Sequence, residues 1–169
     1  MKTMNKTRRM VYLALLIGLA IALHTFEASL ALPLPYGIKL GLANIISLVT
    51  IQFFSLPEMA LLNILRVVLS GLLTGNIFNY MWFISCGGVL FSTVIIIIGK
   101  RLFKMPVISL SILSSIFHGI GQVLVVCYIT SSSAFLTWLL IMFISGIPTG
   151  IFTGTVASVC INYLKGRLK

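Results

Sequence analysis

The chain has 169 residues, of which 59% are hydrophobic and 8% are charged, and its mean hydropathy is +1.16. A soluble domain of this composition would have too few polar side chains to cover its surface, which indicates a protein embedded in lipid. Twelve Lys and Arg residues stand against two acids, Glu27 and Glu58, and aspartate is absent from the sequence. Magnesium-dependent chemistry on diphosphates is therefore excluded for this chain alone, because the carboxylates that hold the metal are missing.

Other catalytic and metal-binding signatures are also missing from the sequence. A nucleotide-binding loop of the form G-x-x-x-x-G-K-[ST] does not occur, and the three cysteines stand in separate apolar runs. His24 and Glu27 lie three residues apart, but they have no cysteine or second histidine nearby to complete a metal site. We therefore expect a protein that is not itself an enzyme and that carries no metal and no cofactor.

Six apolar runs approach the length of about 20 residues that a helix needs to cross a bilayer. In chain order these expected spans are Met10–Leu32, Leu40–Phe54, Met59–Leu73, Tyr80–Gly99, Val107–Thr130 and Ala134–Leu164. The first lacks a small-residue cleavage pattern, so we expect a transmembrane helix rather than a signal peptide. The second and third are short, so they are tilted, drawn inward or extended by the flanking loops. The sixth contains Pro148, which predicts one kinked helix; two re-entrant pieces are the alternative.

Ten of the twelve basic residues fall into three clusters that fix the expected topology. Residues 1–9 carry four, residues 100–106 carry three and residues 165–169 carry three. Six spans place all three clusters on one side of the membrane, which the positive-inside rule makes the cytoplasmic side. We therefore predict an all-α membrane protein in a bacterial cell membrane, with six transmembrane helices and both termini in the cytoplasm. Residues 1–169 form a single integral membrane domain in this prediction.

Polar side chains gather in the half of the predicted bundle that lies away from these clusters. Such groups are costly in hydrocarbon, so they point at one another or into a cavity. Two cations against one acid in this half favour an anionic ligand. The predicted substrate-binding residues are Glu27, Lys39, Asn44, Arg66, Asn76, His118 and Gln122.

A structural role is the alternative for several of these residues. Glu27 would then form an ion pair with Lys39 or Arg66. His118 and Gln122, four residues apart on one helix face, would join helices by hydrogen bonds.

The first span also carries small residues at every fourth position, namely Ala14, Gly18 and Ala22. Such a stripe lets another helix approach closely. It predicts either a docking surface for a partner subunit or packing within this protein's own bundle.

Several of these segments resemble a known membrane family. They are the run Leu34-Pro35-x-Gly37-Ile38-Lys39-Leu40-Gly41-Leu42-Ala43-Asn44 after Glu27, then Arg66, and then His118-Gly119-x-Gly121-Gln122. This pattern resembles the family labelled heptaprenyl diphosphate synthase component I, also called Gx transporters. That family is similar to the substrate-binding S components of energy-coupling factor (ECF) transporters, which are six-helix proteins with a ligand pocket near the outer face.

The resemblance implies a substrate-binding subunit of an ECF-type importer. It would capture a small anionic or amphipathic molecule, of vitamin, flavin or isoprenoid type, at the outer face. Residues 33–39 would be the outer gating loop, the stripe on the first helix would dock a coupling transmembrane subunit, and partner ATPases would drive transport. Nucleic acid is not an expected partner. The alternative is a non-catalytic membrane subunit of a polyprenyl (heptaprenyl) diphosphate synthase in quinone biosynthesis.

Overall fold

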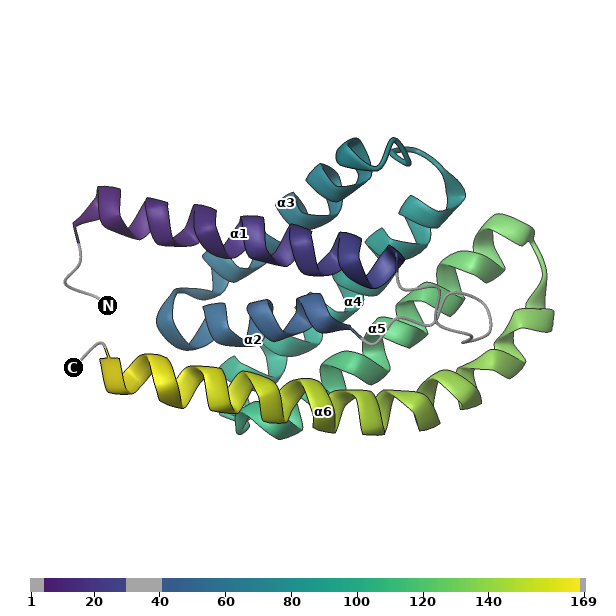
Figure 1. Cartoon of the computed structure of the whole chain (residues 1–169). Coiled ribbons are helices and arrows are strands. Elements are labelled where there is room, and N and C mark those ends of the chain that lie inside the picture. Colours follow the sequence, from purple (N-terminus) through teal and green to yellow (C-terminus); the bar gives the residue numbers. More distant parts are fainter. Residues whose placement is uncertain (1–4, 30–40, 168–169) are drawn as a thin grey trace.

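The protein is a bundle in which successive helices run in opposite directions (Figure 1). The computed structural model describes residues 5–29 and 41–167, and this part of the chain contains no strand. The elements in chain order are α1 (Lys6–Ser29), α2 (Leu42–Phe53), α3 (Leu56–Leu73), α4 (Tyr80–Arg101), α5 (Val107–Thr130), the short 3-10 helix η2 (Ser133–Thr137) and α6 (Trp138–Arg167). The all-α membrane-type fold predicted from the sequence is confirmed.

Five of the described helices are long and apolar enough to cross a membrane, and α2 is shorter, with 12 residues. Every position of α2 from Ala43 to Ile51 is buried, in contact with α1, α3 and α6. A helix that is buried on every side belongs in the interior of a bundle. The short second span is therefore drawn inward, and six full crossings stay a prediction.

The C-terminal half of the bundle packs closely through glycines. Gly150 of α6 lies so near α5 that a Cβ atom at this position would come within 2.4 Å of the Cα atom of Ile112. A Cβ atom on Gly121 of α5 would likewise stand 2.5 Å from the carbonyl oxygen of Gly87 on α4. Small residues let the backbones of membrane helices approach in this way. Helix α6 is continuous through Pro148, so the re-entrant alternative does not apply.

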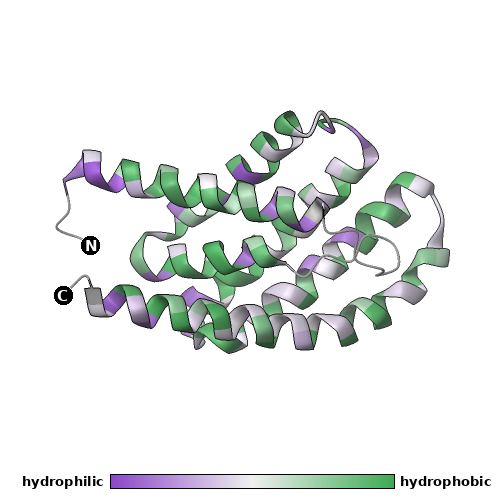
Figure 2. Cartoon of the chain, in the orientation of Figure 1, coloured by the Kyte–Doolittle hydropathy of each residue, from purple (hydrophilic) through white to green (hydrophobic). Residues whose placement is uncertain are grey.

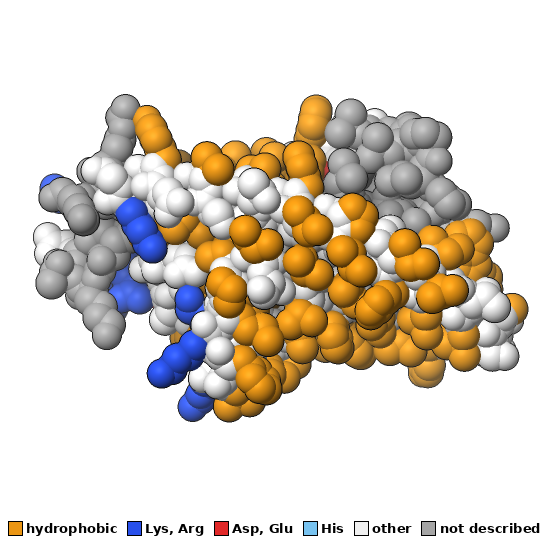
Figure 3. Space-filling view, turned by 90° about the horizontal axis from the view of Figure 1, so that it is seen from below, with side chains coloured by type: hydrophobic (Ala, Val, Ile, Leu, Met, Phe, Trp, Pro, Cys, Tyr) orange, Lys and Arg blue, Asp and Glu red, His pale blue; other side chains and the backbone are white. Residues whose placement is uncertain are grey.

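The Lys and Arg side chains visible on the face in Figure 3 gather at one end of the molecule, the end at which α1 begins and α6 ends (Figure 1). Here the guanidinium of Arg9 forms a two-point ion pair with the carboxylate of Glu58, both N–O distances being 2.6 Å. Lys100 donates a hydrogen bond to Gln52 at 3.2 Å. Apolar residues predominate along the helices beyond this end (Figure 2). The shared end agrees with the predicted grouping of the three basic clusters, and its cytoplasmic location stays a prediction.

Candidate functional site

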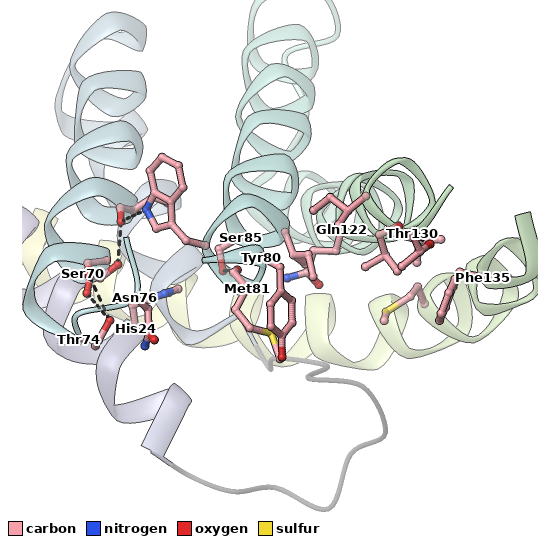
Figure 4. A pocket seen from close by; sticks show the side chains of 18 of the residues that line it. His24, Ser70, Thr74, Asn76, Tyr80, Met81, Ser85, Gln122, Thr130 and Phe135 are labelled. Atoms are coloured by element: carbon pink, nitrogen blue, oxygen red, sulfur yellow. Dashed lines mark hydrogen bonds between the residues drawn. The ribbon is translucent and has the colours of Figure 1, made fainter. Parts of the chain in front are cut away.

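A cavity of about 670 Å³ lies at the opposite end of the bundle, where α3 ends and α4 begins. Figure 4 shows this cavity from close by. Its walls come from the last turns of α1, α3 and α5, the first turns of α4 and α6, and η2. Because successive helices alternate in direction, these turns meet at one end, away from the basic residues. The volume falls within the range of about 300–1,000 Å³ that is typical of small-molecule sites.

Aromatic side chains form much of the cavity wall. The two tryptophans of the chain, Trp82 and Trp138, both line it, together with Tyr80 and Phe135. The indole N–H of Trp82 donates a hydrogen bond to the carbonyl oxygen of Val67 on α3 at 3.1 Å. This bond fixes one of the indole rings across the boundary between α3 and α4. Rigid aromatic walls of this kind bind flat or apolar ligands by contact area.

The polar part of the wall, among the described residues, consists mainly of hydroxyl and amide groups. Among the described residues, no Asp, Glu, Lys or Arg side chain lines the cavity. The polar lining residues, apart from the aromatic ones, are His24, Thr25, Ser70, Thr74, Asn76, Ser85, Gln122 and Thr130. All five of their hydroxyl groups, on Thr25, Ser70, Thr74, Ser85 and Thr130, donate to carbonyl oxygens three or four residues earlier in the chain. Neutral hydrogen-bonding groups on an aromatic wall orient a ligand without requiring it to be charged.

Two of the predicted binding residues, Asn76 and Gln122, line the cavity, one from the α3–α4 loop and the other from α5 (Figure 4). His118 lies behind this wall. A Cβ atom on Gly88 of α4 would stand 2.8 Å from both the Cε1 atom of His118 and the Cγ atom of Gln122. The two side chains therefore pack side by side on a glycine of α4, as their shared helix face predicted, and His118 supports the position of Gln122.

Three other predicted residues form a separate buried cluster where α1, α2 and α3 meet. The carboxylate of Glu27 accepts a hydrogen bond from the backbone N–H of Gly41 at 2.5 Å. Arg66 donates to the side-chain oxygen of Asn44 at 3.4 Å, and the charge of Glu27 acts favourably on Arg66. These contacts tie the beginning of α2 to α1 and α3. None of the three residues lines the cavity.

Arg66 lies on α3, close to a residue of the same helix that lines the cavity. It is only 1% exposed and stands one turn before Ser70, which lines the cavity. Its Nε and Nη1 atoms make no hydrogen bond to the described residues. Lys39, with the rest of the predicted gating segment 33–39, lies outside the described residues.

The small-residue stripe of α1 faces away from the bundle. Ala14, Gly18 and Ala22 are all exposed, and a Cβ atom on Gly18 would have no neighbour within 4 Å. The opposite face of α1 is buried at Ala20, which packs with Ile46 and Leu62. The stripe therefore does not pack against the other described helices of this chain, which was one of its two interpretations.

The sequence interpretation did not include the tryptophans or Met142 as lining residues. In a chain with 59% hydrophobic residues, an aromatic or apolar side chain at a helix end does not stand out. The usable signal was positional, because Trp82 and Trp138 both lie near the start of an expected span, at the same end of the bundle. Tryptophans at such positions are ordinarily assigned to the membrane interface.

Comparison with known proteins identifies one family. The sequence profile of the family described as heptaprenyl diphosphate synthase component I matches residues 16–160. No curated protein and no solved structure matches the chain.

Proposed function

This chain belongs to the heptaprenyl diphosphate synthase component I family, and we propose that it works as the substrate-binding membrane subunit of an ECF-type importer. In this role it captures a small anionic or amphipathic molecule at the outer face of the membrane. A coupling transmembrane subunit and two ATPases complete the transporter. The observation that carries the proposal is the cavity at the end of the bundle opposite the basic residues.

The position of the cavity matches the direction of import. If the basic end faces the cytoplasm, as the positive-inside rule requires, the cavity faces outward and takes its ligand from outside the cell. The sequence has no phosphate-binding loop, so the energy for transport comes from partner subunits.

The predicted binding residues take different parts in this proposal. Asn76 and Gln122 contact the ligand directly, and His118 holds Gln122 in place. Glu27, Asn44 and Arg66 support the cavity from the neighbouring cluster, where they fix the first turn of α2.

The exposed stripe of α1 is the proposed docking surface for the coupling subunit. Replacement of Ala14, Gly18 or Ala22 by Leu should prevent close approach of a partner helix. The experiment is a pull-down of the tagged chain from its native membrane in mild detergent, with mass spectrometry of the proteins recovered. We expect a coupling membrane protein and two ATPases with the wild type, and their loss with Gly18→Leu. Thr155→Leu, an exposed change on α6, is the matched control and should keep the partners.

The second candidate function is a membrane subunit that anchors a soluble prenyl synthase, and the basic end favours it. Exposed cations there, among them Arg101, Lys104 and Lys165, offer a surface for an acidic partner. The same pull-down separates the two functions. Recovery of a soluble synthase without ATPases, dependent on residues 100–106 and insensitive to Gly18→Leu, would overturn the importer proposal.

A further inference from the structure

The charge of the cavity wall restricts what can bind there. A ligand group with a full charge loses its hydration when it enters a cavity, and it is stable there only beside an opposite charge or several aligned donors. The described lining provides neither Lys nor Arg. Of the two buried charges nearby, Glu27 accepts a hydrogen bond from Gly41 and Arg66 donates one through Nη2 to Asn44. Neither residue lines the cavity.

The shape and chemistry of the wall favour a flat ring. Trp82, Trp138, Tyr80 and Phe135 offer π surfaces, on which an aromatic ring packs better than a saturated one. Met81 and Met142 add polarizable sulfur atoms that adapt to the edge of a ring.

The neutral polar groups stand beside these aromatic side chains. Asn76 and Gln122 each carry an amide that both donates and accepts hydrogen bonds. Such amides match carbonyl, hydroxyl or ring-nitrogen groups on an uncharged ligand.

We propose that the cavity selects an uncharged, flat aromatic or quinone-like ring with hydrogen-bonding groups on its edge, and that it disfavours the same ring carrying an anionic group. This inference rests on the proposed function; of the two substrate classes given there, it keeps the amphipathic class, as a neutral aromatic molecule, and drops the anionic one.

The test uses the full chain in nanodiscs of zwitterionic lipid and three matched probes. The first is 2-naphthol, a flat neutral ring; the second is 2-naphthyl phosphate, the same ring with an anionic group. The third is decahydro-2-naphthol, the saturated and non-planar analogue, which is used as a competitor. Because both tryptophans of the chain line the cavity, energy transfer from tryptophan to the naphthyl ring reports binding directly.

A pair of valine variants separates the cavity from the surrounding lipid. Val126→Phe fills the cavity from α5, whereas Val94→Phe adds the same ring to an exposed face of α4. We expect saturable binding of 2-naphthol that weakens about tenfold in Val126→Phe and stays within about twofold of wild type in Val94→Phe. The phosphate should bind at least about tenfold more weakly than 2-naphthol. Decahydro-2-naphthol should be a poor competitor.

Three outcomes would overturn the inference. They are binding of 2-naphthyl phosphate that is as tight as or tighter than that of 2-naphthol, competition by decahydro-2-naphthol that is as strong as that by 2-naphthol, and equal signals in the two valine variants, which indicate partition into lipid.

If Val126→Phe does not fold, Trp82→Phe and Trp138→Phe serve instead. The tryptophan that remains in each must show saturable transfer to 2-naphthol, and its failure to do so contradicts binding in the cavity. The pull-down tests the importer role independently. If the wild-type chain recovers no ATPase but still prefers 2-naphthol over the other two probes, the importer role alone is overturned.

Discussion

The indole ring of Trp82 lies directly against the backbone of Gly71. A Cβ atom at position 71 would stand 2.5 Å from the Cδ1 atom of the indole and 2.6 Å from its Nε1 atom. From this position the indole N–H reaches the carbonyl oxygen of Val67 (Figure 4). The position of Trp82 in the cavity wall therefore requires a glycine, which has no side chain, at position 71 of α3.

We expect Gly71→Ala to destabilise the protein and to disturb the cavity. The added methyl group displaces the indole, at a cost of about 1–3 kcal/mol for overpacking, and breaks its hydrogen bond to Val67, at a further cost of about 1 kcal/mol. The gain in helix propensity, about 1 kcal/mol, offsets only part of this cost. Thermal unfolding should show a lower Tm, and the tryptophan emission should shift to longer wavelength as Trp82 moves.

Gly18→Ala is the control for this change, because a Cβ atom on Gly18 has no neighbour within 4 Å. It should leave the emission unchanged and the Tm equal to or slightly above that of the wild type. Equal Tm and emission for Gly71→Ala and Gly18→Ala would contradict the packing of the indole on α3.

The contact between α5 and α6 predicts a second effect of an added methyl group. Gly150→Ala places a Cβ atom against the backbone of Ile112, where no side-chain rotation can relieve the clash, so the helices must separate. We expect a loss of about 2–3 kcal/mol in unfolding free energy, measured by denaturant titration in detergent. Gly166→Ala, near the end of the same helix with open space at its Cβ position, should change stability little. A neutral Gly150→Ala would show that the two helices are packed less closely.

The helices could be predicted closely from the sequence, because the length of an apolar run and the basic residues beside it are direct consequences of a bilayer. The expected span Val107–Thr130 coincides with α5, and the expected sixth span lies within η2 and α6. The burial of α2 was one of three alternatives, since a short apolar run shows that a helix is unusual but not where it lies.

The candidate site was only partly predictable for a related reason. A polar residue in an apolar run indicates that its burial must be compensated, but not by which partner. Gln122 and Arg66 gave the same signal; one lines the cavity and the other contacts Asn44. The choice between them depends on which way each helix is rotated, and a single sequence does not determine this rotation.

The buried cluster of Glu27, Asn44 and Arg66 predicts that Glu27 and Arg66 contribute to stability in a strongly coupled way. Arg66→Met removes the cation and leaves the buried carboxylate without its charge partner. Glu27→Gln keeps a hydrogen-bond acceptor for Gly41 but leaves the buried guanidinium uncompensated. Each single change should cost about 3 kcal/mol of stability in the absence of ligand. The double variant should cost clearly less than the sum, as measured by a double-mutant cycle of unfolding free energies.

Additive effects in this cycle would show that the two charges do not stabilise each other. If both single variants keep wild-type stability without ligand, the cluster has no structural role. The earlier interpretation of Glu27 and Arg66 as direct ligand contacts would then be the better one.

The orientation of the bundle predicts which residues are accessible from outside the cell. In a variant with the native cysteines replaced by alanine, Ser133→Cys introduces a thiol at the cavity end, and Phe103→Cys introduces one in the basic loop. Both positions are exposed. On intact cells, a membrane-impermeant maleimide should label the thiol at position 133 and not the one at position 103. The reason is that the positive-inside rule keeps the Lys100–Lys104 end in the cytoplasm. After the membrane is permeabilised, both should react. The reverse pattern on intact cells would place the cavity on the cytoplasmic side and rule out capture of a ligand from outside.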